Sequence, residues 1–492
     1  MDKHNFIGDI GEFQLDEVST ASQSQEMIIS EHGMKTLDSM DKNNPRNWSR
    51  ARKTLLFVSL MSSSLLADGG MVWGGTLVTP QAIEWGISVT HSATSMNYGI
   101  LLQGFGGMFA VPLIETYGRY PVWIWPQAIT MFMVLGATLS KDYTTFTVFR
   151  TLQGLFGTVP QVIGLPIIHD MYSPEEWPRM INIWGTAFMV GPYLAPALAG
   201  YIGDASTWVI SFAVLTAIYA LSTLMVLVFG AETYYTPGKA PIPRFASYIG
   251  NHNTGLPKRA TILHWSKVMI AYVFKFPLLM TGIATLITFT WPIGIATTID
   301  VFLHSPPYNF NTIQASSMRF AGVVGALGAL TINKPGWLVG FIFNEWIYKR
   351  HNAKWRTEYR LHGVWFPLSS MVCGLLTYGL TMHFGKHWIG IVFGWIMVTL
   401  GMVASTVAVT AYALEKYPDQ ATVVSAILNM WRTSGGFAVG YFQTAWIARN
   451  GLGLVFGIQA IVVGVAVVLC IVPVFIVERK YPRRGCIETR ES

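Results

Sequence analysis

The stretch TLLFVSLMSSSLLADGGMVWGGTLVTP, residues 54–80, is the most informative segment of this chain. It is long and largely apolar, and it holds one charged residue, Asp68, near its centre. A helix rises about 1.5 Å per residue, so about 20 apolar residues are enough to cross the hydrocarbon layer of a bilayer. The stretch therefore predicts a transmembrane helix with a carboxylate deep in the membrane.

Asp68 is unfavourable in such a position, because a charged side chain at the bilayer centre costs about 3 kcal/mol on insertion scales. Serines at 62–64 and glycines at 69, 70, 74 and 75 surround it and indicate a small, polar helix face turned towards other helices or a cavity. One interpretation is a structural Asp68, satisfied by a neighbouring helix. The other is a carboxylate linked to protons or substrate, which we favour because no other acidic residue lies as deep in an apolar stretch.

The composition places the whole chain in the membrane class. Hydrophobic residues make up 52% of the 492 residues and charged residues 12%, about half the charged share of a soluble protein. The net charge of +7 does not indicate a nucleic-acid partner, because the basic residues lie between the apolar stretches. The three cysteines have no disulfide or metal-site spacing, so we expect neither a metal nor a cofactor.

Twelve apolar segments of transmembrane length follow one another, six on each side of a polar stretch. They lie at about 54–80, 93–114, 121–140, 146–169, 180–203, 208–230, 276–298, 313–333, 363–384, 388–411, 422–447 and 452–477. The sequence thus predicts an all-α integral membrane protein with twelve transmembrane helices.

The predicted domains follow from this pattern. They are a disordered cytoplasmic tail (1–52), a first six-helix bundle (53–231), a cytoplasmic central loop (232–265), a second six-helix bundle (266–478) and a cytoplasmic tail (479–492). The N-terminal tail (1–52) contains no apolar core segment, so we expect no cleavable signal peptide. The first membrane helix is then expected to direct the chain to the membrane.

The distribution of Lys and Arg sets the predicted orientation. With the N-terminus inside, the internal connections and the segments flanking the membrane hold 24 Lys and Arg, whereas the external connections hold three, Lys141, Lys386 and Arg449. Basic residues accumulate on the cytoplasmic side of membrane proteins. Both termini are therefore predicted to be cytoplasmic.

Three arginines fall inside predicted spans. Arg150 and Arg319 lie near the external ends of their spans, where a long side chain can reach the interface. Arg432 lies ten residues into its span and reaches water only if it lines a cavity. Either Arg150 or Arg432 can be the partner of Asp68, and these three residues are our candidates for proton coupling.

A short motif after the second span introduces a family resemblance. The segment ETYGRYP at 115–121 is similar to the D-x-x-G-R-R/K loop of the major facilitator superfamily. Glu115, Gly118 and Arg119 match this loop in type, whereas Tyr120 replaces its second basic residue and position 111 is valine instead of glycine. The resemblance implies two pseudo-symmetric six-helix bundles with a pathway between them, and a gating role for the three matching residues.

A second motif resembles the proton-coupled members of the superfamily. RTLQG at 150–154 is similar to their R-x-x-Q-G motif, so the resemblance adds Gln153 and Gly154 to Arg150 as motif residues. The spacing places Arg150 and Gly154 on one helix face.

A third motif resembles the antiporters. GPYLAP at 191–196 is similar to their G-P-x-x-G-G element, with Ala195 and Pro196 in place of two glycines. Gly191 and Pro192 let helices approach closely and bend, which is also their ordinary structural use.

Recurring cytoplasmic segments narrow the resemblance to fungal twelve-span drug:proton antiporter-like transporters. They are NPRNWS at 44–49, ETY at 232–234, EYRL at 358–361 and YALEKYP at 412–418. The P-E-S-P-R signature of sugar porters is absent at 230–236. These matches are specific for the family and give no information about the substrate.

Between the two bundles we expect a cavity lined by aromatic and small residues. The candidates are Trp73, Tyr98, Gln103, Trp184, Tyr193, Trp291, Asn429 and Trp431. An aromatic residue in a span more often packs between helices, but Gln103 and Asn429 stand out because an amide in mid-span needs hydrogen-bond partners. Such a lining suits an amphipathic or aromatic organic molecule.

The predicted function is secondary active transport of a small organic molecule, most consistent with proton-coupled efflux of a drug-like compound or secondary metabolite. The alternative is a proton-coupled importer of a small organic nutrient. A multispan enzyme is less favoured, because the one suggestive pair, His169 and Asp170, is adjacent and does not share a helix face. We predict a monomer in the plasma membrane, with the vacuolar or another internal membrane as the alternative, and protons, substrate and the lipid bilayer as partners.

The orientation gives a direct test. A labelling tag inserted at residue 250 should react only after the cell is permeabilised, because the central stretch is predicted to be cytoplasmic. Labelling of that tag from outside intact cells would contradict the predicted topology.

Overall fold

The computed structural model describes residues 41, 43–174, 176–235, 243–250, 258–332 and 356–480, without the side chains of 258, 259, 331 and 332. All regular elements in these ranges are helices, as the sequence predicts. The tail predicted to be disordered lies outside the described residues up to position 40, as do most of the C-terminal tail and parts of the central loop.

The first half is built from seven long helical segments. These are α2 (Arg50–Val72), α4 (Val89–Tyr117), α5 (Pro121–Leu139), α6 (Tyr143–Gly157), α7 (Val159–Met171), α8 (Trp177–Ala205) and α9 (Trp208–Phe229). Two short helices, η2 (Trp73–Thr76) and α3 (Val78–Trp85), connect α2 to α4. The predicted span 146–169 is divided between α6 and α7 at Thr158, just before Pro160, which cannot donate a backbone hydrogen bond.

The second half repeats this design. Its helices are α12 (Phe276–Leu303), α13 (Thr312–Met318), α14 (Phe320–Ile332), α16 (Trp365–His383), α17 (Ile389–Lys416), α18 (Ala421–Asn450) and α19 (Leu452–Lys480). The predicted central loop is partly helical, with α10 (Arg244–Ile249) and the beginning of α11 (Lys258–Val273). The remaining short elements are η1 (Pro45–Asn47), η3 (Thr357–Val364) and η4 (Pro418–Gln420).

Ten helical segments in the described residues are long and apolar enough to cross a membrane. Two of the twelve predicted spans, which correspond to α8 and α18, are not apolar enough to be included in these ten. These helices have 29 and 30 residues and are therefore long enough to cross a membrane. Both helices lie between the halves, where polar and small residues replace lipid-facing ones. Apolar composition therefore supports ten of the twelve spans, and helix length supports the other two.

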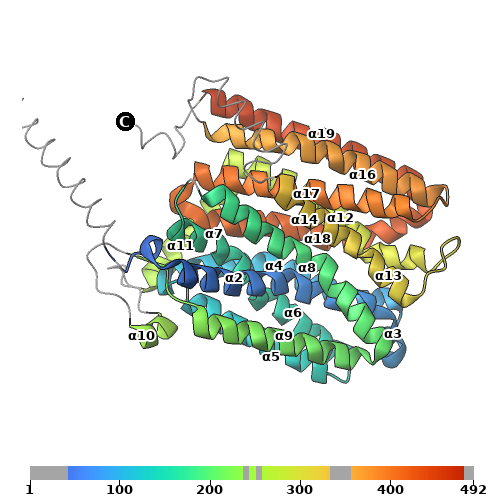
Figure 1. The fold of residues 1–492 in the computed structure, drawn as a ribbon, viewed down its shortest axis with the longest axis horizontal. Helices are drawn as coiled ribbons and strands as arrows, with labels where there is room; N and C mark the ends of the chain where they lie inside the picture. The colour runs from blue at the N-terminus through green and yellow to red at the C-terminus, as the bar shows by residue number, and fades with distance from the viewer. Residues whose placement is uncertain are drawn as a thin grey trace, which may run out of the picture.

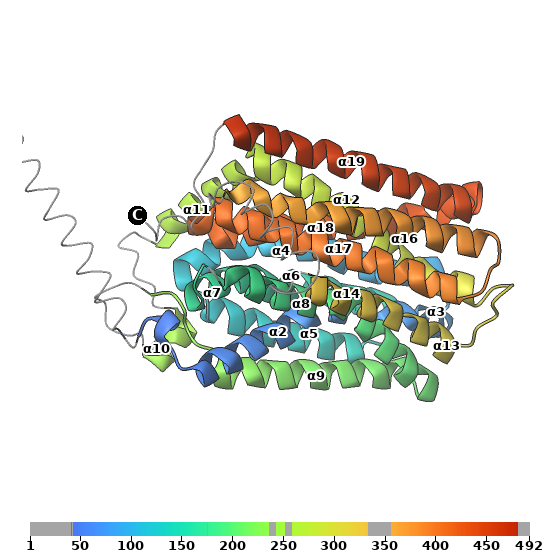
Figure 2. The ribbon, with the colours of Figure 1, turned by 45° about the horizontal axis from the view of Figure 1, so that its top comes forward.

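The helices lie side by side with their axes along one direction (Figure 1). In both views α10, α11, the beginning of α2 and the end of α19 lie at the same end of the bundle (Figure 2). This is the end where the charge distribution predicts the cytoplasm. The halves meet chiefly where α4 and α7 pack on α18 and where α8 packs on α13, α14 and α17.

Within the first half, α2 and α8 approach to backbone contact at Gly191. A Cβ on Gly191 would lie 2.5 Å from the carbonyl oxygen of Leu65 and 2.9 Å from the nitrogen of Gly69. Pro192 follows inside α8 and lines a small cavity near the centre of the bundle. The Gly-Pro element therefore fixes how closely two helices of one half can pack.

The close approach predicts the effect of a larger side chain. Gly191→Leu should lower the unfolding temperature markedly, because overpacking costs roughly 1–3 kcal/mol and the obstacle here is backbone. Gly457→Leu is the matched control, since a Cβ on Gly457 of α19 meets nothing within 4 Å. Equal unfolding temperatures of the two variants in detergent would contradict this packing.

Candidate functional site

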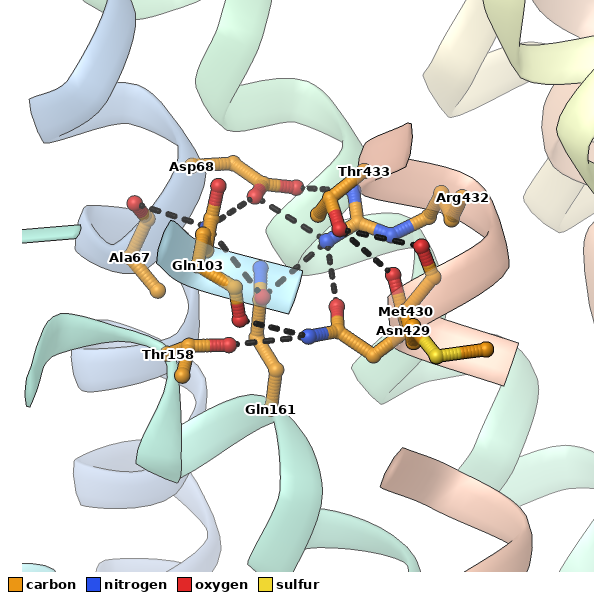
Figure 3. Close-up of polar contacts among 9 residues, drawn as sticks. All are labelled: Ala67, Asp68, Gln103, Thr158, Gln161, Asn429, Met430, Arg432 and Thr433. Atoms are coloured by element: carbon orange, nitrogen blue, oxygen red, sulfur yellow. Dashed lines mark hydrogen bonds and ion pairs between the residues drawn. The ribbon is translucent and has the colours of Figure 1, made fainter. Parts of the chain in front are cut away.

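A buried ion pair joins the two halves at the centre of the bundle (Figure 3). Asp68 comes from α2 and Arg432 from α18, and their exposed fractions are 5% and 3%. Arg432 Nη1 donates to Asp68 Oδ2 at 2.5 Å and Nη2 donates to Asp68 Oδ1 at 3.1 Å. Neither charge is solvated by bulk water, so each is stabilised by the opposite charge in this two-point contact.

Three amide side chains complete the pair's hydrogen bonds (Figure 3). Gln103 of α4 donates to Asp68 Oδ1 at 2.7 Å. Arg432 Nη2 donates to Gln161 Oε1 of α7 at 3.0 Å and to Asn429 Oδ1, one turn earlier on α18, at 2.8 Å. Every partner of the guanidinium is therefore an oxygen, and the residues come from four different helices.

The same network extends from Asn429 to Thr158, at the break between α6 and α7. Asn429 Nδ2 donates to Thr158 Oγ1 at 2.8 Å and to the carbonyl of Gln103 at 3.4 Å. Gln161 Nε2 is buried without a hydrogen-bond partner. A buried unpaired donor is costly and is a natural position for a water or a ligand group.

Aromatic rings and a small cavity flank the ion pair. The Arg432 guanidinium carbon lies 5.2 Å from the ring centre of Phe188 and 4.8 Å from that of Phe289, close enough for cation–π attraction. Asp68 and Arg432 also line a cavity of about 20 Å³ available to water centres, where one water needs roughly 10–15 Å³. The remaining walls are mostly apolar, with Met71, Val72, Ile100, Gln103, Pro192, Phe289, Ile293, Thr433 and Gly436.

Arg150 is not the partner of Asp68, and it does not extend to the interface. Its exposed fraction is 0%, and Nη1 donates to the Gly70 carbonyl and to Gln153 Oε1, both at 2.7 Å. Nη2 donates to the carbonyl of Met71. Arg150 thus binds the carbonyl end of α2 just after Asp68, where a positive charge is favoured.

The other motif residue on α6, Gly154, lies where α6 crosses α4. A Cβ on Gly154 would overlap the carbonyl of Gly99, so the glycine permits contact between the two backbones.

Arg319 also does not extend to the membrane–water interface. It lies between α13 and α14 with an exposed fraction of 2%, and its Nη2 is 2.6 Å from Asp300 Oδ2. Nη1 donates to the carbonyl of Ala296 at 3.0 Å. Arg150 and Arg319 can be buried because nearby carbonyl groups, an amide oxygen or a carboxylate accept hydrogen bonds from their guanidinium groups. Apart from Gln153, these partners come from other helices and could not be identified from the sequence.

The motif loop between α4 and α5 forms a second polar cluster, at the end predicted to be cytoplasmic. Arg119 forms an ion pair with Asp170 and donates to the Pro166 carbonyl at 2.9 Å. Burial lowers the pKa of Arg119, and the charges of Glu115 and Glu232 oppose that shift. His169 Nδ1 is 3.6 Å from Asp170 Oδ1, so His169 lies beside this cluster and is an ion-pair partner of Asp170 only when its ring is protonated.

Gly118 allows the turn in this loop. Its φ is 103°, which favours glycine, and a Cβ there would lie 2.5 Å from Glu232 Oε2. That carboxylate accepts hydrogen bonds from the backbone nitrogens of Arg119 at 3.2 Å and Tyr120 at 3.1 Å.

Polar contacts join the halves on both sides of the central pair. At the end with α10 and α11, the hydroxyl of Thr422 bonds to the carboxylate of Glu115. At the opposite end, the hydroxyls of Tyr201 on α8 and Ser317 on α13 are 2.7 Å apart. The halves therefore touch at both ends of the bundle in this conformation.

The predicted lining residues divide into two groups. Gln103 and Asn429 belong to the central network, and Tyr193 packs across the interface against Trp395 of α17 with ring centres 6.0 Å apart. Trp184 also lines a cavity between α8 and α17, opposite Val407, whereas the other candidates pack within one half or are exposed in this conformation. Trp73 bonds to Ser211, Trp184 bonds to Ser64, Trp291 packs on Phe442 and Trp446, Trp431 packs on Gly282, and Tyr98 is 43% exposed.

Sequence reasoning missed Gln161, Thr158 and Phe289. Gln161 had a detectable signal, since it is an amide in mid-span like Gln103. Phe289 had none, because an apolar span gives no indication of which aromatic residue faces the other half. Within the described ranges, no three His, Cys, Asp or Glu side chains are placed to hold a metal ion.

Comparisons with known proteins agree with this architecture. The family model described as Major Facilitator Superfamily matches residues 56–440. An uncharacterised transporter of Schizosaccharomyces pombe is 23% identical over 427 residues, covering 84% of this chain and 86% of its own. The MFS-type transporter penM of Penicillium rubens is 24% identical over 440 residues, covering 84% and 82%.

Two further proteins extend the comparison. The MFS-type transporter mpsC of Macrophomina phaseolina is 25% identical over 420 residues, covering 80% of this chain and 79% of its own. The crystal structure of the human organic anion transporter MFSD10 superposes with a TM-score of 0.57 at 16% identity, over 86% of this chain and 100% of that one. The structural match supports the fold alone.

The central ion pair predicts an asymmetric effect on stability. Arg432→Met should destabilise the protein by roughly 3–5 kcal/mol, because it leaves Asp68 buried without a counter-charge. The double variant Asp68→Asn, Arg432→Met should regain part of the loss. Arg449→Met on the exposed end of α18 is the control, and thermal unfolding in detergent is the measurement. If Arg432→Met unfolds like the control, the pair does not hold the halves together.

Proposed function

The chain belongs to the major facilitator superfamily, and we propose that it exports a small organic molecule across the membrane in exchange for protons. Asp68 is the proposed proton-binding group. The observation that carries the proposal is the buried Asp68–Arg432 pair, which joins α2 of the first half to α18 of the second.

Protonation of Asp68 removes one charge of this pair and weakens its attraction for Arg432. The central contact between the two halves is then weaker, which favours opening of one side. Deprotonation restores the pair and favours the closed arrangement. A proton that moves with a membrane potential of 100 mV gains about 2.3 kcal/mol, which can drive transport against a concentration gradient.

The proposed substrate is amphipathic or aromatic. Apart from Asp68 and Arg432, the cavity beside the pair is lined mainly by apolar side chains, and the amide of Gln103 and the hydroxyl of Thr433 supply a few polar groups. This combination is typical of sites for small organic ligands. The cavity in this closed conformation is smaller than such a substrate, so we expect it to widen when the halves separate.

Import of a small organic nutrient is the alternative, because the same proton site can couple transport in either direction. We propose that the chain acts as a monomer, since both halves of one chain supply the site. The plasma membrane is the proposed location, and an internal membrane is the alternative.

Replacement of Asp68 tests the proposal. Asp68→Asn keeps the side chain's shape but has no titratable group, so it should abolish proton-driven accumulation of a candidate substrate in everted vesicles while substrate exchange persists. Asp68→Glu should retain part of the coupling. The control is Asp204→Asn, which changes an exposed carboxylate at the far end of α8.

Wild-type accumulation by Asp68→Asn, with an unchanged response to a pH gradient, would reject Asp68 as the proton site. The direction of movement separates the two functions. Proton-driven uptake into everted vesicles supports export from the cell, whereas uptake into intact cells supports import.

A further inference from the structure

The short helix α10 presents two large apolar side chains away from the bundle. It lies beside the ends of α5 and α9 (Figure 1), and the indole nitrogen of Trp125 donates to the Tyr248 carbonyl at 2.9 Å. Phe245 and Ile249 are four residues apart and therefore share a helix face, with exposed fractions of 77% and 67%. Exposure of both to water is unfavourable, whereas the boundary between headgroups and acyl chains accommodates them.

Two guanidinium groups lie at the same end of the bundle as this face. Arg244, the first residue of α10, donates from Nη2 to the carbonyls of Leu227 at 3.1 Å and Val228 at 2.8 Å, at the end of α9. Arg52, in the first turn of α2, stacks on the Trp48 ring at 3.7 Å. Because α2 packs along α9, with the Ser59 hydroxyl donating to the Met225 carbonyl at 3.3 Å, Arg52 lies at the same end of this helix pair as Arg244.

The described part of the chain provides no carboxylate partner for either arginine. The ion pairs it contains involve other basic residues. Two like charges at the same end of a helix pair repel each other, and an anion placed between them is attracted by both. The forked guanidinium geometry suits phosphate oxygens.

The apolar face and the cationic pair together fit one occupant. We propose that Arg52, Arg244, Phe245 and Ile249 form a binding site for an anionic phospholipid in the leaflet at this end of the bundle. Its phosphate lies between the guanidiniums and its acyl chains cover the two apolar side chains. A free phosphate or an acidic peptide satisfies the charges, but neither places lipid chains against Phe245 and Ile249.

The location gives the bound lipid a structural consequence. Because α10 belongs to the connection between the two halves, the lipid fixes one end of this connection at the membrane surface. The inference is independent of the transport direction and of the proton site, since it uses none of the residues of the central network.

Lipid titration of the purified full-length protein tests the proposal. Phosphatidylserine with brominated acyl chains should quench tryptophan fluorescence, because Trp48 and Trp125 lie beside the proposed site. Arg52→Gln and Arg244→Gln should each weaken the apparent affinity about fivefold. Phe245→Ser should also weaken it, and Arg449→Gln at the opposite end should not.

Three outcomes would overturn the proposal. The first is that Arg52→Gln binds like the Arg449→Gln control, which is decisive even if Arg244→Gln is poorly folded. The second is that brominated phosphatidylcholine quenches as strongly as the anionic lipid. The third is that inorganic phosphate displaces the lipid while Phe245→Ser binds normally, which would indicate a site for soluble anions.

Discussion

The cost of an isolated charge in a low-dielectric environment is the constraint on which the centre of this protein depends. Asp68 and Arg432 are too deeply buried to be solvated by bulk water, so each requires the other. This requirement joins α2 to α18, whose paired residues are 364 positions apart in the chain. Gln103, Gln161 and Asn429 then supply the remaining hydrogen bonds, which brings α4 and α7 into the same network.

A buried ion pair is weak evidence for stability as such, because well-packed apolar residues often serve as well or better. In the proposed mechanism its value is different, because protonation of Asp68 removes one of the two charges. Contacts within the first half are of a different kind, since Gly191 and Gly154 place backbone against backbone and Arg150 binds the end of α2. Near its centre the first half is thus held by backbone packing and by the hydrogen bonds of Arg150, whereas the central contact between the halves is an ion pair. This difference favours movement of the halves as units.

The two ends of the bundle show how charge is handled where water is near. Arg119, Asp170 and Glu232 form a compact cluster in which each charge has a partner or accepts backbone hydrogen bonds. Arg52 and Arg244 have no carboxylate partner within the described residues, and Arg244 is followed on its helix by the exposed Phe245 and Ile249. In the first arrangement, the charges are balanced by other groups of the protein. In the proposed lipid site, the phosphate of an anionic phospholipid supplies the negative charge that the second arrangement lacks.

The sequence by itself determined the membrane class, the helical fold, the approximate limits of the long helices and the depth of Asp68. These are local properties, because the bilayer is a fixed external reference against which segment length and apolarity can be measured. Motif residues such as Glu115 and Arg119 could also be identified, because a short motif is recognised by residue type and spacing alone.

Only the tertiary structure decided which residues meet. It selected Arg432 over Arg150 as the partner of Asp68, paired Arg319 with Asp300, and placed Phe289 rather than Trp291 beside the guanidinium. These outcomes depend on the rotation of each helix about its axis and on neighbours from the other half of the chain. A nearly uniformly apolar span shows no preferred face. Its sequence therefore contains little information about the rotation of the helix or about its neighbours.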